Sequence, residues 1–310
     1  MEVVQGTSSL PVEGESALTI GFFDGVHRGH QAVIGRVVQV ARDRGLRAVA
    51  VTFDRHPLET LSPGKVPKLL TTLRRKAALI EALGADVLFV LEFTDEVSRW
   101  TPEGFVDRVL SGGLGARHVA VGTNFTFGHK AAGNFDVLTE LGVARGFTVE
   151  AMSLFKVDGR PVSSTSVREA LAEGDLDWPK RALGRRYLVE GTVVPGAGRG
   201  RGLGFPTVNL RTPDALLLPG RGVYAGRALF DGQVFTAAIN IGVNPTFGRE
   251  PLHLEAHLLD FEGDLRGRVL GVEFWARLRD ELVFDSAEAL AARIEEDVQE
   301  TRRLVDSGAA

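Results

Sequence analysis

Two histidines three residues apart are the first residues of the chain whose types and spacing could do chemistry. Residues 21–30 read GFFDGVHRGH and place both histidines where an apolar run gives way to an amphipathic segment. A glycine-rich turn that opens a helix offers backbone N–H groups and the positive end of the helix dipole to an anion. Histidines at such a junction indicate chemistry on a phosphate group.

A second segment, rich in glycine and arginine, lies far along the chain. Residues 196–209 read GAGRGRGLGFPTVN. Such a loop can wrap phosphate groups, and the hydroxyl of Thr207 and the amide of Asn209 suit a hard cation such as Mg²⁺. The glycines taken alone fit a solvent-exposed loop equally well. With the histidine pair, this segment predicts two phosphate sites and therefore two reactions.

Length and composition limit the class of protein. A chain of 310 residues exceeds the usual size of a single core, so we expect two domains. The absence of cysteine excludes disulfides, thiolate metal sites and cysteine nucleophiles. The amino-terminal residues show neither a basic cluster nor an apolar run, and no stretch approaches a membrane span. We therefore expect a cytoplasmic protein without a signal peptide or a membrane partner.

The charge distribution argues against a nucleic-acid partner. The formal net charge is −4, and neither half of the chain has a basic excess. Every cationic side chain after Gly184 is an arginine, which excludes a lysine-dependent Walker loop there. No GxxxxGK[ST] motif occurs earlier in the chain. Any phosphate site must therefore depend on other groups.

The first half of the chain alternates apolar runs with amphipathic segments. Strands are expected at residues 17–22, 47–53, 86–93, 117–121 and 148–151. Of the helices between them, one ends at Gly45, one follows Thr72, and one begins at Thr101 with a proline in its first turn. This order predicts an α/β domain with a parallel sheet, in which ligands bind beyond the carboxyl ends of the strands.

The second half changes to short β-type runs. After a short helix at residues 166–172 and a connection at 174–186, strands are expected at 187–194, 222–229, 235–241, 254–259 and 269–278. Strands without intervening helices predict a small antiparallel β-barrel, and residues 286–305 predict a terminal helix packed across it. We place the domain boundary after Gly184, which gives domains 1–184 and 185–310.

Moving a nucleotidyl group from ATP to another phosphate requires that charge on the α-phosphate be neutralised while pyrophosphate leaves. No covalent enzyme intermediate is needed, so positioning and electrostatics suffice. Histidines and helix-end amides suit the α-phosphate, and a more distant cation suits the leaving group. Residues 163–168 read SSTSVR and supply hydroxyls at a helix start and the candidate cation, Arg168.

Here the chain resembles a known family. Residues 27–30 (HRGH) resemble the HxGH motif of the nucleotidyltransferase superfamily, and residues 163–168 resemble its triphosphate-binding motif. Residues 21–27, 52–57 and 121–128 are similar to segments of the bifunctional bacterial riboflavin kinase/FMN adenylyltransferases, also called FAD synthetases. This resemblance implies a Rossmann-like domain that adenylylates FMN with MgATP.

On that resemblance, His27 and His30 stabilise the transferring phosphate. The implied ATP-binding residues are Gly21, Phe22, Asp24, Gly29, Ser163, Ser164, Thr165 and Arg168. The implied flavin contacts are Asn124, Phe127 and Phe53, because an aromatic side chain suits the flavin ring.

The second half resembles the riboflavin kinase module, a six-stranded barrel. The similar segments are residues 222–225, 240–247, 255–261 and 272–274, with GFPTVN at 204–209 in place of the usual GFPTAN. The resemblance implies that Thr207 and Asn209 bind the metal and that Glu273 is the general base for the riboflavin 5′-hydroxyl. The implied phosphate-binding residues of the loop are Gly198, Arg199, Gly200 and Gly204. Glu255 is interpreted as a structural partner of the loop arginines.

Together these features predict a bifunctional enzyme of FAD biosynthesis. ATP phosphorylates riboflavin to FMN, and a second ATP converts FMN to FAD with release of pyrophosphate. Mg²⁺ serves both steps, no bound redox cofactor is needed, and a homo-oligomer is compatible with the sequence. Two alternatives are kept: a nucleotidyltransferase for another phosphorylated substrate with a flavin-sensing barrel, and an RNA-binding barrel, which the missing basic excess disfavours.

Overall fold

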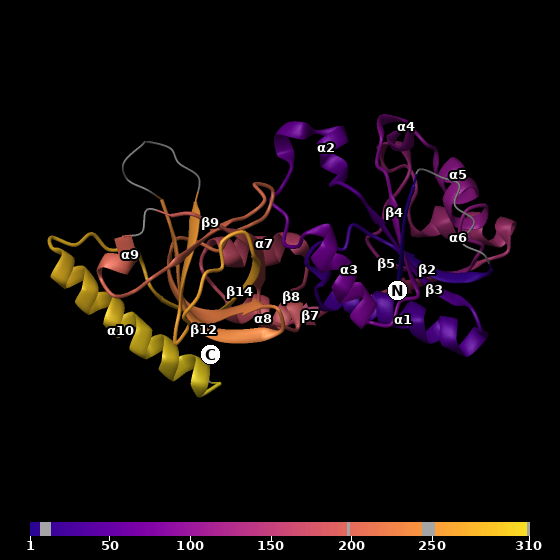
Figure 1. The fold of residues 1–310 in the computed structure, drawn as a ribbon. Helices are drawn as coiled ribbons and strands as arrows, with labels where there is room; N and C mark the ends of the chain where they lie inside the picture. Colours follow the sequence, from indigo (N-terminus) through magenta and orange to yellow (C-terminus); the bar gives the residue numbers. More distant parts are fainter. Residues whose placement is uncertain (7–13, 197–198, 244–251, 309–310) are drawn as a thin grey trace. The chain divides into compact units, whose positions relative to one another are not determined.

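The computed structural model describes residues 1–6, 14–196, 199–243 and 252–308 (Figure 1). The chain divides into two compact units, Met1–Ser164 and Thr165–Ala310. The boundary between functional domains after Gly184 stays a prediction, because compactness and function need not divide a chain at the same residue.

A six-stranded parallel sheet forms the centre of the first unit. Its strand order is β1-β4-β3-β2-β5-β6, and every neighbouring pair is parallel. The strands are β1 (Glu2–Gly6), β2 (Ser16–Ile20), β3 (Arg47–Phe53), β4 (Val87–Leu91), β5 (Ala116–Gly122) and β6 (Thr148–Met152). The predicted α/β class is confirmed, and β1 is an additional edge strand that was not predicted from the sequence.

Helices connect these strands and a small hairpin follows them. The helical segments are η1 (Asp24–Val26), α1 (Arg28–Arg44), α2 (Pro57–Leu61), η2 (Pro63–Lys65), α3 (Leu73–Ala82), α4 (Asp95–Ser98), α5 (Pro102–Phe105), η3 (Val106–Ser111), η4 (His129–Ala131) and α6 (Phe135–Arg145). The hairpin consists of β7 (Lys156–Val157) and β8 (Arg160–Pro161). The caps predicted at Thr72, Thr101 and Gly45 are present.

Alternate residues of the strands face two different apolar layers. On one face, small residues such as Ala48 and Ala50 pack with Ile34 of α1 and Ile80 of α3. On the other face, larger residues such as Phe89 pack with side chains of α5, η3 and α6. Small side chains let a helix approach a sheet closely. The alanines on this face therefore allow α1 to pack tightly against the sheet, and the turn that leads into α1 is held there with it.

The second unit is built around a closed antiparallel barrel with the order β10-β13-β12-β11-β14-β9. Its strands are β9 (Leu188–Val194), β10 (Val208–Arg211), β11 (Gly222–Phe230), β12 (Gln233–Gly242), β13 (His253–Leu258) and β14 (Val269–Arg279). Its helices are α7 (Ser164–Ala172), α8 (Asp177–Leu183), α9 (Arg199–Gly202) and α10 (Ala287–Asp306). The barrel and its terminal helix are confirmed.

Two local expectations for the second half differ from the structure. The segment predicted as a connection, residues 174–186, contains α8, whose proline lies in the first turn, where a missing N–H is tolerated. The four residues of β10 were not predicted, although they close the barrel between β9 and β13. None of the helices in the described part of the chain has the length and apolar content that a membrane span requires.

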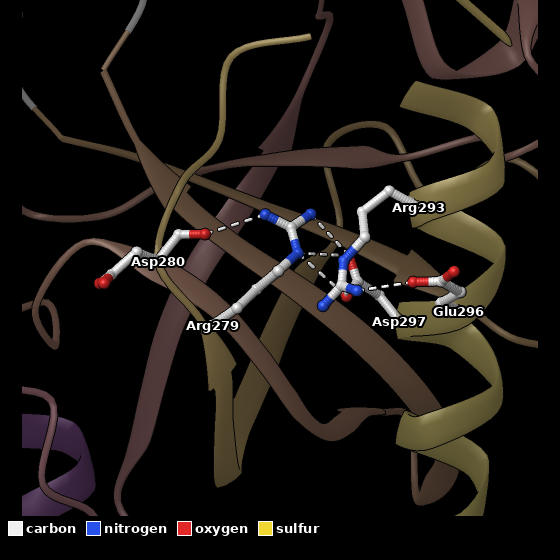
Figure 2. Close-up of polar contacts among 5 residues, drawn as sticks. All are labelled: Arg279, Asp280, Arg293, Glu296 and Asp297. Atoms are coloured by element: carbon white, nitrogen blue, oxygen red, sulfur yellow. Dashed lines mark hydrogen bonds and ion pairs between the residues drawn. The ribbon is translucent and has the colours of Figure 1, made fainter. Parts of the chain in front are cut away.

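A buried ion pair joins α10 to β14. The guanidinium of Arg279 lies 2.6 Å from the carboxylate of Asp297, and the Asp297 side chain is only 5% exposed. Figure 2 shows Arg279 between this carboxylate and the backbone carbonyl oxygen of Asp280, with Arg293 and Glu296 extending the network along α10. A buried guanidinium that loses its carboxylate is left uncompensated, so this pair should matter to the stability of the barrel.

We expect Asp297→Ala to destabilise the barrel unit by about 3–5 kcal/mol, because it leaves the Arg279 charge buried without its partner. Chemical denaturation followed by intrinsic fluorescence measures this change. The matched control is Glu300→Ala, which breaks an exposed ion pair with Arg303 on the same helix and should cost below about 1 kcal/mol. If both variants lost the same free energy of unfolding, burial of the Arg279–Asp297 pair would not be the reason for its effect on stability.

Candidate active sites

The turn between β2 and α1 has an unusual backbone conformation. Phe23 has a φ of 53° and Val26 a φ of 40°. A β-branched residue such as Val26 rarely adopts positive φ, and such strain persists where the surrounding structure enforces it, often at functional sites. Gly21 begins the turn and donates its N–H to the Val51 carbonyl oxygen at 3.0 Å. The anchored strand end therefore sets the conformation of the segment that leads to the histidines.

Asp24 holds this turn from the inside. Its side chain is buried, and its carboxylate accepts hydrogen bonds from the backbone N–H groups of Leu70 and Thr71 at 2.9 and 3.1 Å. The backbone carbonyl oxygen of Asp24 accepts a hydrogen bond from the hydroxyl of Ser164 at 2.9 Å. Ser164, from the second predicted phosphate motif, is thus joined to the first. The contact of Asp24 with ATP stays a prediction.

His27 and His30 form a stacked pair at the amino terminus of α1. Their ring centroids lie 3.6 Å apart with an interplanar angle of 18°. The backbone N–H of His30 donates to Nδ1 of His27 at 3.3 Å, so His27 caps the helix. A Cβ at Gly29 would lie 3.2 Å from the His27 ring, and glycine therefore lets this ring lie close to the backbone. The two imidazoles behave as one unit at the helix end.

The environment of His30 favours a neutral ring. Its Nδ1 atom is buried and has no hydrogen-bond partner among the described residues. Burial, followed by the nearby His27 and Lys76, lowers the pKa of His30 well below its usual value. A proton on Nδ1 would lack an acceptor, so we assign the proton to Nε2. A neutral ring of this tautomer can donate one hydrogen bond to a phosphate oxygen.

Lys76 lies beside this site and was not predicted from the sequence. Its side chain on α3 is 3% exposed. Its Nζ lies 3.3 Å from Oγ1 of Thr52 and 4.0 Å from the centroid of the Phe22 ring. Burial lowers the pKa of Lys76 to about 8, against the opposing effect of Asp24. The only signal in the sequence is its place on the buried face of α3.

The other residues of the triphosphate motif, on either side of Ser164, lie in different environments. Ser163 is exposed just before α7, Thr165 is exposed on the helix, and Arg168 is half-buried one turn later. Thr165 and Arg168 belong to the second unit. The roles of these three residues in binding the β- and γ-phosphates stay predictions.

The three residues predicted to contact flavin differ in accessibility. Phe53 is the last residue of β3 and Asn124 lies just after β5, so both stand at the carboxyl edge of the sheet, as His27 does. Phe53 is half-buried and Asn124 is exposed. Phe127 belongs to the apolar core, is 8% exposed and stacks on Phe125 at 5.5 Å. The geometry therefore favours Phe53 and Asn124 over Phe127 for direct contact.

In the barrel, the glycine-arginine loop folds back on itself before β10. The Gly200 carbonyl oxygen accepts a hydrogen bond from the Phe205 N–H at 2.9 Å. A Cβ at Gly200 would lie 2.3 Å from the Phe205 carbonyl oxygen, which excludes a larger residue there. Arg199 begins the short helix α9, and Gly204 is exposed in the following turn. Gly198 and the predicted motif residues 244–247 lie outside the described residues.

Thr207 and Asn209 converge on Glu255. The hydroxyl of Thr207 donates to Oε2 of Glu255 at 3.4 Å. Asn209 on β10 and Asn240 on β12 stand directly opposite Glu255 on β13, and opposed residues of antiparallel strands share one face. The hydroxyl, the two amides and the carboxylate thus form an oxygen-rich patch on the outside of the barrel. Oxygen donors of this kind are the ligands that Mg²⁺ prefers.

This patch fits a metal that is shared with substrate. In the described part of the chain, no three histidine, cysteine, aspartate or glutamate side chains gather as a metal site. Mg²⁺ is usually held by one or two protein groups together with phosphate oxygens rather than by a cage of protein ligands. The donors at Thr207 and Asn209, with the Glu255 carboxylate beside them, match that mode of binding.

Glu273 lies on another part of the barrel. It stands opposite Leu188 of β9, whereas Asn209 stands opposite Val194 of the same strand. These two positions are six residues apart along β9, which corresponds to roughly 20 Å along the strand. The Glu273 carboxylate accepts a hydrogen bond from Nε1 of Trp275 at 2.7 Å. The structure thus brings Glu255, rather than Glu273, to the predicted metal residues.

Comparisons with known proteins identify the family of each half of the chain. A profile of the FAD synthetase family matches residues 10–166, and one of riboflavin kinase matches residues 183–305. A bifunctional riboflavin kinase/FMN adenylyltransferase of Pseudomonas fluorescens is 42% identical over 306 aligned residues. The alignment covers 98% of this chain and 98% of that relative. The chain belongs to this family of bifunctional enzymes.

Other relatives extend over nearly the same length. The bifunctional riboflavin kinase/FMN adenylyltransferase of Listeria monocytogenes is 38% identical, with 92% of this chain and 91% of the relative covered. A crystal structure described as a macrolide-efflux protein from Streptococcus pneumoniae superposes with a TM-score of 0.90 at 26% identity, over 97% of this chain and 99% of that one. The fold of this chain is therefore shared with a solved structure over nearly its whole length.

Proposed function

We propose that the two units divide the two reactions of the family between them. The barrel transfers the γ-phosphate of ATP to riboflavin and forms FMN and ADP. The α/β unit transfers the adenylyl group of a second ATP to FMN and forms FAD and pyrophosphate. The observation that carries this division is that each unit holds its own set of phosphate-directed groups: the stacked histidine pair in one, the oxygen-rich patch in the other.

In the α/β unit, the phosphate of FMN attacks the α-phosphorus of ATP directly. Negative charge grows on the α-phosphate oxygens in the transition state, where hydrogen-bond donors stabilise it most. The imidazoles of His27 and His30 and the backbone N–H groups at the start of α1 are these donors. The hydroxyls of Ser163 and Ser164, which belong to the same unit, bind the β- and γ-phosphates, which leave together as pyrophosphate.

In the barrel, a carboxylate must take the proton of the riboflavin 5′-hydroxyl as the phosphoryl group is transferred. We assign this role to Glu255, because it lies beside Thr207 and Asn209. Thr207 and Asn209 would hold Mg²⁺ together with the phosphate oxygens, and such an ion would supply positive charge to the transferring phosphate. Glu273, the base implied by resemblance alone, is the alternative, and the two assignments predict different variants to be inactive.

The division of reactions is tested by following isotopic label from ATP. With riboflavin and MgATP, label from the γ-phosphate should enter FMN, whereas label from the α-phosphate should appear only in FAD, and FMN should precede FAD in a time course. Separation of flavins by chromatography with scintillation counting measures both. Formation of FMN without FAD would instead support a nucleotidyltransferase for another substrate. Unchanged riboflavin would contradict the kinase assignment.

A further inference from the structure

The hydrogen-bonded ladder between β10 and β13 stops one residue short of Thr207. β10 begins at Val208, which stands opposite Ala256 of β13. In an antiparallel pair the next opposed residues would be Thr207 and His257, but Pro206 has no N–H with which to extend the ladder. Strand pairing therefore ends just before a residue predicted to bind the metal, and it does not by itself fix the position of the Thr207 hydroxyl.

The side chain of His257 makes a contact where the ladder has ended. Its Nδ1 atom lies 2.8 Å from the carbonyl oxygen of Pro206. Its ring also packs edge-to-face with the ring of Phe205, with ring centroids 5.7 Å apart and an interplanar angle of 86°. The N–H of the same Phe205 donates to the Gly200 carbonyl oxygen at 2.9 Å. The two residues that precede Thr207 are therefore both held in place.

The contact with Pro206 fixes which nitrogen of the His257 ring carries a proton. A carbonyl oxygen can only accept a hydrogen bond, so the ring nitrogen beside it must donate. The neutral ring therefore has its proton on Nδ1 and a lone pair on Nε2. The opposite tautomer would set a lone pair against the carbonyl oxygen and lose the contact. The tautomer of His257 is thus set by a backbone group of the loop.

His257 shares the outer face of β13 with Glu255. The two residues are two apart along the strand and alternate with the buried residues Ala256 and Leu258. The Thr207 hydroxyl donates to Glu255 at 3.4 Å, and His257 holds the residue just before Thr207. One strand therefore carries both the carboxylate of the site and the side chain that holds the adjoining loop against it.

We propose that His257 is a positioning residue for phosphoryl transfer to riboflavin, whose Nδ1–H holds the Pro206 carbonyl oxygen and so keeps the Thr207 hydroxyl beside Glu255. The inference rests on the proposed role of Thr207 in binding Mg²⁺ and phosphate. Groups that orient the ligands of a metal contribute about 10–100-fold to metal affinity or activity. His257 acts through Thr207, so its effect should vanish where the Thr207 hydroxyl is absent.

The test compares His257→Asn with His257→Gln in the full-length chain. The amide nitrogen of asparagine is bonded to Cγ, as Nδ1 of histidine is, and can donate to Pro206 from nearly the same place. Glutamine carries the same amide one atom further from the backbone. We expect His257→Gln to lower the kcat/KM for MgATP in FMN formation by about 10–100-fold and His257→Asn to retain most of it. FAD formation from supplied FMN should be unchanged in both variants.

Two further measurements use the ligand-free protein and do not depend on turnover. The ¹⁵N chemical shifts of the histidine rings, recorded at mildly alkaline pH, should show the Nδ1–H tautomer for His257, whose signals are assigned by their loss in His257→Asn. Hydrogen exchange of the peptide that spans residues 203–210 should be faster in His257→Gln than in the wild type, because its anchor is lost. In His257→Asn the exchange should remain close to that of the wild type.

An Nε2–H tautomer in the wild type would overturn the proposal, and so would unchanged hydrogen exchange in His257→Gln. Equal kinase activity of the asparagine and glutamine variants would also overturn it, because the placement of the donor would then have no effect.

Thr207→Val completes a double-mutant cycle. Adding His257→Gln to this variant should have little further effect, and additive losses would show that His257 does not act through Thr207. Failure of the proposed role of Thr207 is recognised separately, because Thr207→Val alone would then form FMN at the wild-type rate.

Discussion

Glu255→Gln should lower the rate of FMN formation from riboflavin by about 10²–10⁴-fold, the range typical for loss of a general base. Glutamine keeps the size of the side chain and can still accept the hydrogen bond that Thr207 donates, but it cannot take a proton. The fold should therefore persist while the chemistry fails. Steady-state kinetics of riboflavin phosphorylation measures the effect, and it should fall on kcat more than on KM for riboflavin.

Two controls make this result specific to one residue and one reaction. FAD formation from supplied FMN should be unchanged in Glu255→Gln, because that reaction belongs to the other unit. Glu273→Gln changes a second strand carboxylate of the same barrel, one engaged with Trp275, and should retain most of the kinase activity. If Glu273→Gln abolishes FMN formation and Glu255→Gln spares it, the base is Glu273.

His30→Ala should reduce FAD formation from FMN by about 10²–10³-fold, the loss seen when one preorganised donor is removed from a developing negative charge. The substitution also removes the ring that stacks on His27 at 3.6 Å, so the second imidazole loses its support. Riboflavin should still be phosphorylated, and FMN should accumulate. A single chromatogram of the flavins, taken after incubation with riboflavin and MgATP, shows both outcomes.

His129→Ala is the matched control for the histidine pair. His129 lies in the same unit, its side chain is exposed on η4, and it should be dispensable for both reactions. Wild-type FAD formation by His30→Ala would exclude His30 from the transfer step. Loss of both activities in a folded His30→Ala variant would contradict the separation of the two sites.

Much of the fold follows from local patterns. The five strands predicted for the sheet and the five predicted for the barrel are present, because runs of apolar and alternating residues define them without reference to the rest of the chain. Besides the short hairpin of β7 and β8, the missed strands are β1 of the sheet and β10 of the barrel, which are short and only partly buried. Their pairing with β4 and with β9 and β13 is what makes them strands, and such pairing joins residues far apart in sequence.

The histidine pair was predictable for a similar reason. A spacing of three residues at the start of a helix puts two side chains on one face of its first turn, whatever the rest of the protein does. The hydrogen bonds of the Asp24 carboxylate could not be predicted from the sequence. Its donors, the backbone N–H groups of Leu70 and Thr71, are far away in sequence and are brought to it only by the tertiary fold. The burial of Lys76 depends equally on how α3 packs against the sheet.

The sequence by itself determined the two fold classes and the family, and it predicted the segments proposed to bind phosphate, because each depends on short patterns read along the chain. Only the tertiary structure decided which carboxylate stands beside Thr207 and Asn209. Glu255 and Glu273 both lie on strands between buried apolar neighbours, so alternation places both on the outside of the barrel. Strand register then sets their neighbours, and register is a property of the closed barrel rather than of either strand.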